Sequence, residues 1–132
     1  MGDLAAFLAA RLDEDEAAAK AACEANWYLE DRKQVSGYGD EFTMATLTSG
    51  DAAHIARHDP ARVLREVEAK REILRECEAV QRLNASTGRE PSRFRDWLLR
   101  HLAAVYRDHP DYSPVWGSLG AASPRGTFLR KA

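Results

Sequence analysis

The chain has 132 residues, of which 45% are hydrophobic and 30% are charged, and its formal net charge is −2, a composition typical of one globular domain with its own core. It contains no apolar run of the roughly 20 residues that a membrane span requires, and Asp3 and Arg11 interrupt the N-terminal apolar stretch where a secretory signal would lie. Cys23 and Cys77 have no CxxC spacing and are typical of reduced core thiols, so we expect a cytoplasmic protein.

The N-terminal segment predicts a helix over residues 4–25. Asp3 is a candidate N-cap, because its side chain can accept a hydrogen bond from the first turn. The helical spacing of the large apolar residues indicates one buried face, which consists of Leu4, Phe7, Leu8 and Leu12.

The pattern changes from helix to strand after this segment. The stretches Trp27–Val35 and Phe42–Leu47 mix aromatic, branched and polar residues, and "SGYGDE" lies between them. We expect a β-hairpin, with its turn in the glycine-containing stretch. A two-stranded hairpin is marginal in water by itself, so it has to pack on the helices or pair with another copy.

Two helices are expected to meet at the sequence "HIARHDPAR". Ser49 or Asp51 is placed to cap a short helix over Ala52–His58, and Asp59 is placed to cap a long helix that begins at Pro60 and runs to about Leu83. The buried face of this long helix is expected to consist of Val63, Val67, Leu74, Cys77 and Val80.

A last helix is predicted over residues 92–107. Its expected apolar face consists of Phe94, Trp97, Leu98, His101, Leu102 and Val105. The Pro-, Gly- and Ser-rich remainder is expected to be poorly ordered beyond residue 116. The sequence thus predicts a predominantly helical α+β fold, with a single domain over residues 1–116 and a tail over residues 117–132.

Three stretches of the chain are similar to a known family. The motif "HIARHDPARVLREVEAKR", the N-terminal "LAAFLAARLDEDE" and the late "YRDHPDY" resemble a family of small actinobacterial proteins, also found in actinobacterial phages, that is known only as a domain of unknown function. The resemblance covers residues 4–16, 54–74 and 106–112. It implies an actinobacterial or phage origin and a cytoplasmic protein, and it implies no activity and no catalytic residues.

Two clusters of histidine and aspartate are candidate metal ligands. His54 and His58 are four residues apart on the predicted short helix, a spacing that can seat one zinc ion. Asp108, His109 and Asp111 could complete a mixed site for a metal-dependent hydrolase. In the structural interpretation, which we favour, these residues form the helix joint and a turn, and the protein has no cofactor.

Basic residues gather in the C-terminal half of the chain. Residues 61–107 carry a net charge of +4, whereas residues 1–30 carry −5. Arg93, Arg100 and Arg107 recur every seven residues along the last helix and form a candidate interaction face. The isoelectric point of about 6.1 argues against a nucleic-acid partner.

The sequence therefore favours a non-catalytic interaction module that contacts another protein or a second copy of itself. In this hypothesis the helical core presents the hairpin, the acidic N-terminal part and the basic C-terminal part to its partner. The alternative is the metal-dependent hydrolase described above.

Overall fold

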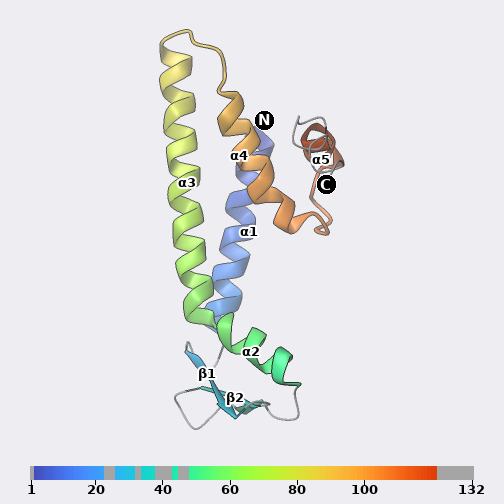
Figure 1. The fold of residues 1–132 in the computed structure, drawn as a ribbon. Coiled ribbons are helices and arrows are strands. Elements are labelled where there is room, and N and C mark those ends of the chain that lie inside the picture. The colour runs from blue at the N-terminus through green and yellow to red at the C-terminus, as the bar shows by residue number, and fades with distance from the viewer. Residues whose placement is uncertain (1, 23–25, 32–33, 38–42, 45–47, 122–132) are drawn as a thin grey trace. The chain divides into compact units, whose positions relative to one another are not determined.

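The computed structural model describes residues 2–22, 26–31, 34–37, 43–44 and 48–121. It confirms a predominantly helical α+β fold in which an N-terminal helix is followed by antiparallel strands and then by further helices (Figure 1). The chain forms two compact units, one from Met1–Arg11 and Lys70–Ala132 and the other from Leu12–Ala69. Among the described helices, none combines the length and the apolar character needed to cross a membrane.

The first helix, α1, spans Gly2–Ala21. It begins before Asp3, so the expectation that Asp3 precedes the helix as its N-cap is wrong. The predicted buried face is confirmed, because Leu4, Phe7, Leu8 and Leu12 are all at most 7% exposed. The unit boundary falls within this helix, so the first three of these residues belong to one unit and Leu12 to the other.

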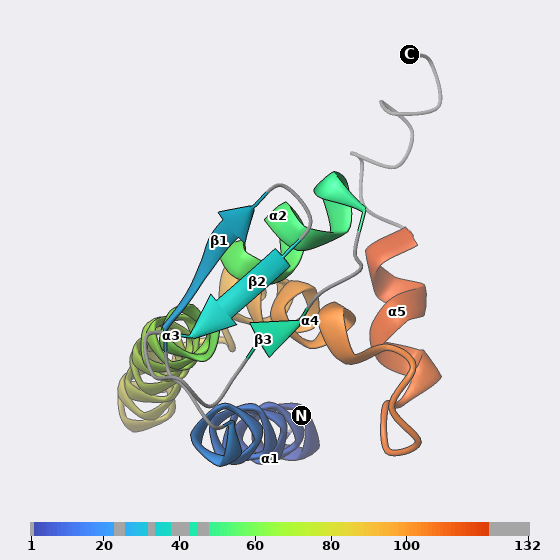
Figure 2. The same cartoon turned by 90° about the horizontal axis from the view of Figure 1, so that it is seen from below.

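The unit Leu12–Ala69 contains a three-stranded antiparallel sheet, ordered β1–β2–β3 (Figure 2). The strands are β1 (Trp27–Asp31), β2 (Gln34–Gly37) and β3 (Thr43–Met44). The stretch predicted as one strand is therefore two paired strands, and the predicted turn after β2 lies mostly outside the described residues. Val35 pairs with Leu29 on one side and Met44 on the other and is fully buried.

Helix α2 (Ser49–Arg57) contacts both β1 and β2. Its N-cap is Thr48, whose side chain accepts the backbone N–H of Asp51 at 3.1 Å. The expectation that Ser49 or Asp51 caps this helix is therefore wrong, because the cap is the residue before Ser49. Thr48 has the extended backbone that a cap requires, whereas Ser49 and Asp51 already lie in the first turn.

Asp59 connects the start of the next helix, α3 (Pro60–Ser86), to the sheet. One carboxylate oxygen accepts the backbone N–H of Arg62 at 2.9 Å, which confirms the predicted N-cap. The other oxygen accepts the backbone N–H of Trp27, the first residue of β1, at 3.2 Å. A single side chain thus caps α3 and holds one end of β1.

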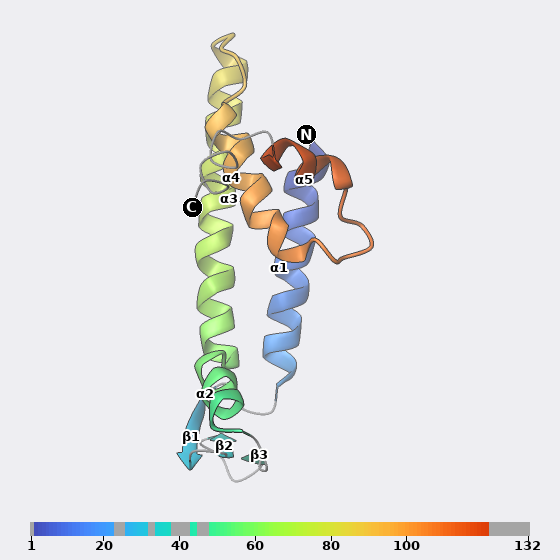
Figure 3. The ribbon, with the colours of Figure 1, turned by 45° about the vertical axis from the view of Figure 1, so that its right-hand side comes forward.

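The other unit packs α1, α3 and α4 (Arg93–Ala103) around a common core. Gly88 ends α3 with a φ of +68°, a conformation that favours glycine. A 3₁₀ turn (Ala104–Tyr106) follows α4, and α5 (Pro114–Ala121) lies on the opposite side of α4 from α3 (Figures 1 and 3). The buried core consists of Leu4, Phe7, Leu8, Leu74, Cys77, Leu99 and Ala103.

The buried face of α4 differs from the predicted one. Arg95, Leu99 and Ala103 are its buried residues, at four-residue intervals. Phe94 and Val105, which were expected in the apolar face, are each 69% exposed. Two adjacent faces of this helical segment carry apolar residues. Periodicity alone therefore does not show which of the two faces packs into the core and which remains exposed.

We predict that Asp59→Ala lowers the free energy of unfolding by about 2 kcal/mol, because it removes both the α3 cap and the bond to β1. Asp59→Asn keeps one acceptor oxygen and should lose about half as much. Urea denaturation of the two variants beside the wild type measures both values. Equal stability of all three proteins would contradict the role assigned to this carboxylate.

Candidate functional site

His54 and His58 lie on one side of the end of α2, with ring centroids 4.3 Å apart. The Nδ1 of His58 is 2.8 Å from the carbonyl oxygen of His54. A carbonyl oxygen only accepts hydrogen bonds, so this nitrogen carries the proton and is unavailable to a metal. Both side chains are exposed, and the backbone N–H of His58 closes the helix end.

The "DHPDY" loop is bound to α1 through Arg11. The guanidinium Nη1 of Arg11 donates to Nδ1 of His109 at 2.8 Å and lies 3.7 Å from an Asp111 carboxylate oxygen. The Nδ1 of His109 also accepts the backbone N–H of Asp111 at 3.1 Å. An Nδ1 that accepts two N–H groups carries no proton, so the neutral ring is protonated at Nε2.

Phe7 lies at the centre of the same contacts. The Arg11 guanidinium carbon is 5.0 Å from the centroid of the Phe7 ring, a cation–π distance. Four rings surround Phe7 at centroid distances of 5.0–6.3 Å, and they belong to Tyr106, His109, Tyr112 and Trp116. His109 and Asp111 therefore help to attach the segment after α4 to α1.

The predicted metal ligands are divided between the two compact units. His54 and His58 belong to the unit Leu12–Ala69, whereas Asp108, His109 and Asp111 belong to the other unit. Within the ranges of the chain that are described, no group of three or more His, Cys, Asp or Glu side chains is arranged to hold a metal ion.

The predicted arginine row consists of residues with different roles. Arg93 and Arg107 are exposed. Arg100 has a side chain only 10% exposed; its Nε donates to Asp96 at 2.9 Å, and its Nη1 donates to the carbonyls of Val115 and Trp116 at 3.2 Å each. Arg100 thus attaches α5 to α4.

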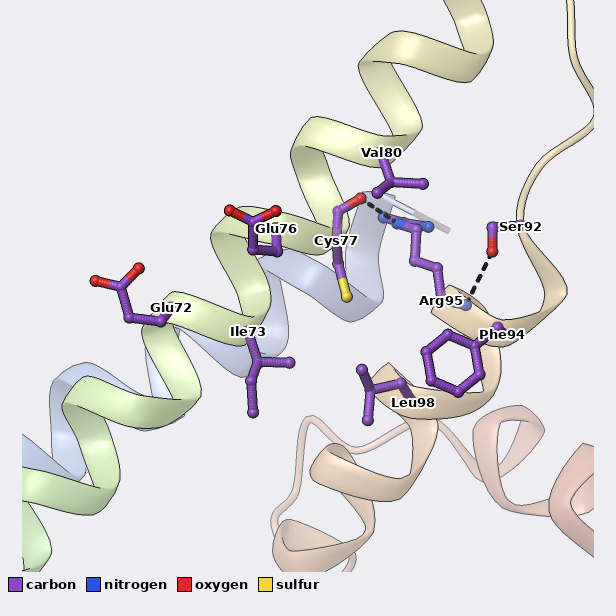
Figure 4. A pocket seen from close by; sticks show the side chains of 9 residues that line it. All are labelled: Glu72, Ile73, Glu76, Cys77, Val80, Ser92, Phe94, Arg95 and Leu98. Atoms are coloured by element: carbon purple, nitrogen blue, oxygen red, sulfur yellow. Dashed lines mark hydrogen bonds between the residues drawn. The ribbon is translucent and has the colours of Figure 1, made fainter.

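A groove between α3 and α4 presents a strongly apolar concave surface. Its volume is about 370 Å³, and its walls are formed largely by apolar side chains. Figure 4 shows Ile73 and Cys77 of α3 facing Phe94 and Leu98 of α4, with Val80 at one end. Val80 is 41% exposed and Phe94 is 69% exposed, so the groove is open to solvent.

Acidic residues of α3 and a basic residue of α4 border the groove. Glu72 and Glu76 lie along the α3 side, where both are exposed, and Glu72 pairs with Arg75. On the other side, Arg95 is 7% exposed, and its Nε donates to the carbonyl oxygen of Cys77 at 3.1 Å. The positive charge of Arg95 is therefore directed into the protein, whereas the Glu72 and Glu76 carboxylates extend outward from the α3 edge of the groove, away from Phe94 and Leu98 (Figure 4).

Cys77 is a structural thiol in the wall of this groove. Burial raises the pKa of the Cys77 thiol above its ordinary value of 9.0; the guanidinium of Arg95 opposes this rise, and Glu76 and Glu78 add to it. A nucleophilic cysteine needs the opposite shift. The expectation of a reduced core thiol is met by Cys77, which is buried and free, whereas Cys23 lies outside the described residues.

Sequence reasoning did not identify this groove. The helical patterns place Val80 and Phe94 on buried faces, and no pattern in the sequence predicts that Arg95 packs inward. One signal was present in the sequence: α4 carries more large apolar residues than a single packed face can bury, so some had to remain at the surface.

Comparison with known families gives one match. A family model described as a family of unknown function, DUF6221, matches residues 1–118. The chain belongs to this family. No curated protein and no solved structure matches the chain.

Arg100→Ala should lower the free energy of unfolding by roughly 2 kcal/mol, because three hydrogen bonds are lost and the half-buried Asp96 carboxylate is left without its guanidinium. The matched variant Arg93→Ala, at an exposed position on the same helix, should stay within about 0.5 kcal/mol of the wild type. Thermal or urea unfolding distinguishes them. Similar small losses in both variants would show that Arg100 does not hold α5.

The pKa shift of Cys77 predicts slow alkylation. Because its thiol ionises above pH 9.0 in the folded chain, the rate of reaction with iodoacetamide should reach half its maximum above that pH, and the midpoint should return to about 9.0 in denaturant. Mass spectrometry of the peptide that contains Cys77 measures the rate. A midpoint below 9.0 in the folded protein would indicate an activated thiol instead.

Proposed function

We propose that this chain is a non-catalytic protein-interaction module and that the α3–α4 groove is its binding surface. The observation that carries the proposal is the open apolar groove itself, with Val80 and Phe94 exposed at its edge. Apolar concave surfaces that remain exposed in a folded unit commonly mark binding sites for protein segments.

The charges around the groove favour one class of partner. Glu72 and Glu76 at the rim attract basic side chains, and they disfavour the phosphate backbone of a nucleic acid. The partner is therefore a short protein segment that carries large apolar residues beside lysine or arginine. This is a narrower surface than the hairpin and the charged halves that the sequence first indicated.

The setting of this function is also part of the proposal. The resemblance of the motif at residues 54–74 supports a role in the cytoplasm of an actinobacterium or one of its phages.

Selection from a library of short random peptides tests the proposal. Binders should be enriched in large apolar residues next to lysine or arginine. Their affinity should fall at least about tenfold, or about 1.4 kcal/mol, in Val80→Glu and in Phe94→Glu. These positions are exposed, so the substitutions should leave the fold intact.

Leu83→Glu is the matched control, because Leu83 is 58% exposed on the same helix but does not line the groove. It should leave the affinity of the selected peptides unchanged. If no peptide is enriched, or if all three variants bind equally well, the groove is not the binding surface.

A further inference from the structure

We propose that the C-terminal segment of the chain, residues 122–132, is an internal occupant of the α3–α4 groove. In this arrangement Phe128 and Leu129 enter the groove, and Arg130 and Lys131 face the carboxylates of Glu72 and Glu76. The inference rests on the proposed function, since it names a ligand for the same surface and a means of regulating access to it.

The composition of the segment matches the groove. Its sequence, "ASPRGTFLRKA", contains two adjacent large apolar residues, three basic residues and no acidic residue. The groove has apolar walls and two exposed carboxylates on one rim. Apolar side chains gain by leaving water, and the basic side chains gain by approaching the rim.

The size of the groove suits a short segment. A volume of about 370 Å³ lies near the lower end of the range of about 300–1,000 Å³ that is usual for ligand pockets. The two large apolar residues of the segment are consecutive, and consecutive side chains point to opposite faces of an extended chain, so a compact turn at these residues is needed to present both to one small groove. A long amphipathic helix would need a longer surface.

The segment is long enough to reach the groove from the end of α5. Figures 1 and 3 show α4 between α5 and the part of α3 that forms the groove, and Arg100 fixes the start of α5 on α4. Phe128 follows the last residue of α5, Ala121, by seven residues. Seven extended residues span about 23 Å, roughly twice the diameter of a helix, which is enough to pass around α4.

Occupation by this segment would make the groove self-regulated. A segment attached to the same chain has a high effective concentration at the groove, so an external partner has to compete with it. The observed affinity for a partner is then reduced in proportion to the fraction of molecules in which the groove is free.

Methyl NMR spectra of the full chain test the contact directly. Phe128→Ser combined with Leu129→Ser should shift the methyl signals of Ile73, Val80 and Leu98. The matched control combines Ser123→Ala with Thr127→Ala in the same segment, and it should leave these signals in place. If the double serine variant shifts no groove methyl, the inference is wrong.

Protein concentration distinguishes a contact within one chain from a contact between chains. Shifts that are independent of concentration support the proposal. Shifts that grow with concentration would place the segment of one molecule in the groove of another, and they would overturn the proposal as stated.

Peptides selected in the experiment described above separate this inference from the proposed function. They should bind the Phe128→Ser, Leu129→Ser variant more tightly than the wild type, by a factor equal to the reciprocal of the free-groove fraction. If groove methyls do not shift but peptide binding still requires Val80 and Phe94, only this inference fails. If peptide binding ignores Val80 and Phe94, the proposed function fails, whatever the methyl signals show.

Discussion

The buried hydrogen bond between Arg95 and the carbonyl oxygen of Cys77 fixes the geometry on which the groove depends. It joins residues 18 positions apart on two helices. Within a helix each carbonyl accepts one backbone N–H, and its second lone pair remains available for a side chain such as this. A buried guanidinium is costly unless it is hydrogen-bonded, so α4 is strongly constrained to start at this point along α3.

This constraint explains why an apolar surface remains open. With Arg95 directed inward at the start of α4, Leu99 and Ala103 follow it into the core at four-residue intervals. Phe94, one position before Arg95, is then turned toward the side of α3 that carries Ile73 and Val80. The groove beside these residues stays open to solvent at Val80 and Phe94. The groove therefore follows from the position of Arg95, whose hydrogen bond to Cys77 links α4 to α3.

Local patterns in the sequence predict the features that depend on one helix alone, and they do not predict those that depend on packing between helices. Helical periodicity was sufficient to predict the buried face of α1, and capping chemistry was sufficient to predict Asp59 as the start of α3. Periodicity failed for α4, because apolar residues occupy two neighbouring faces and only tertiary packing selects one of them. The groove was not predicted for this reason. Arg95 is buried and Phe94 is exposed, whereas arginine is usually exposed and phenylalanine is usually buried. The roles of His58, which closes α2, and of His109, which holds the loop after α4 on Arg11, depend on tertiary contacts that the sequence pattern does not specify.

The double use of Asp59 also has a consequence for local motion. Its carboxylate accepts one N–H from the first turn of α3 and another from the first residue of β1. If the start of α3 or the start of β1 frays, one carboxylate oxygen of Asp59 loses its hydrogen bond. The side chain is then less well held, so the hydrogen bond of its other oxygen is weakened. The amide protons of Trp27 and Arg62 should therefore exchange with solvent as one cooperative opening, although 35 positions separate them in the sequence.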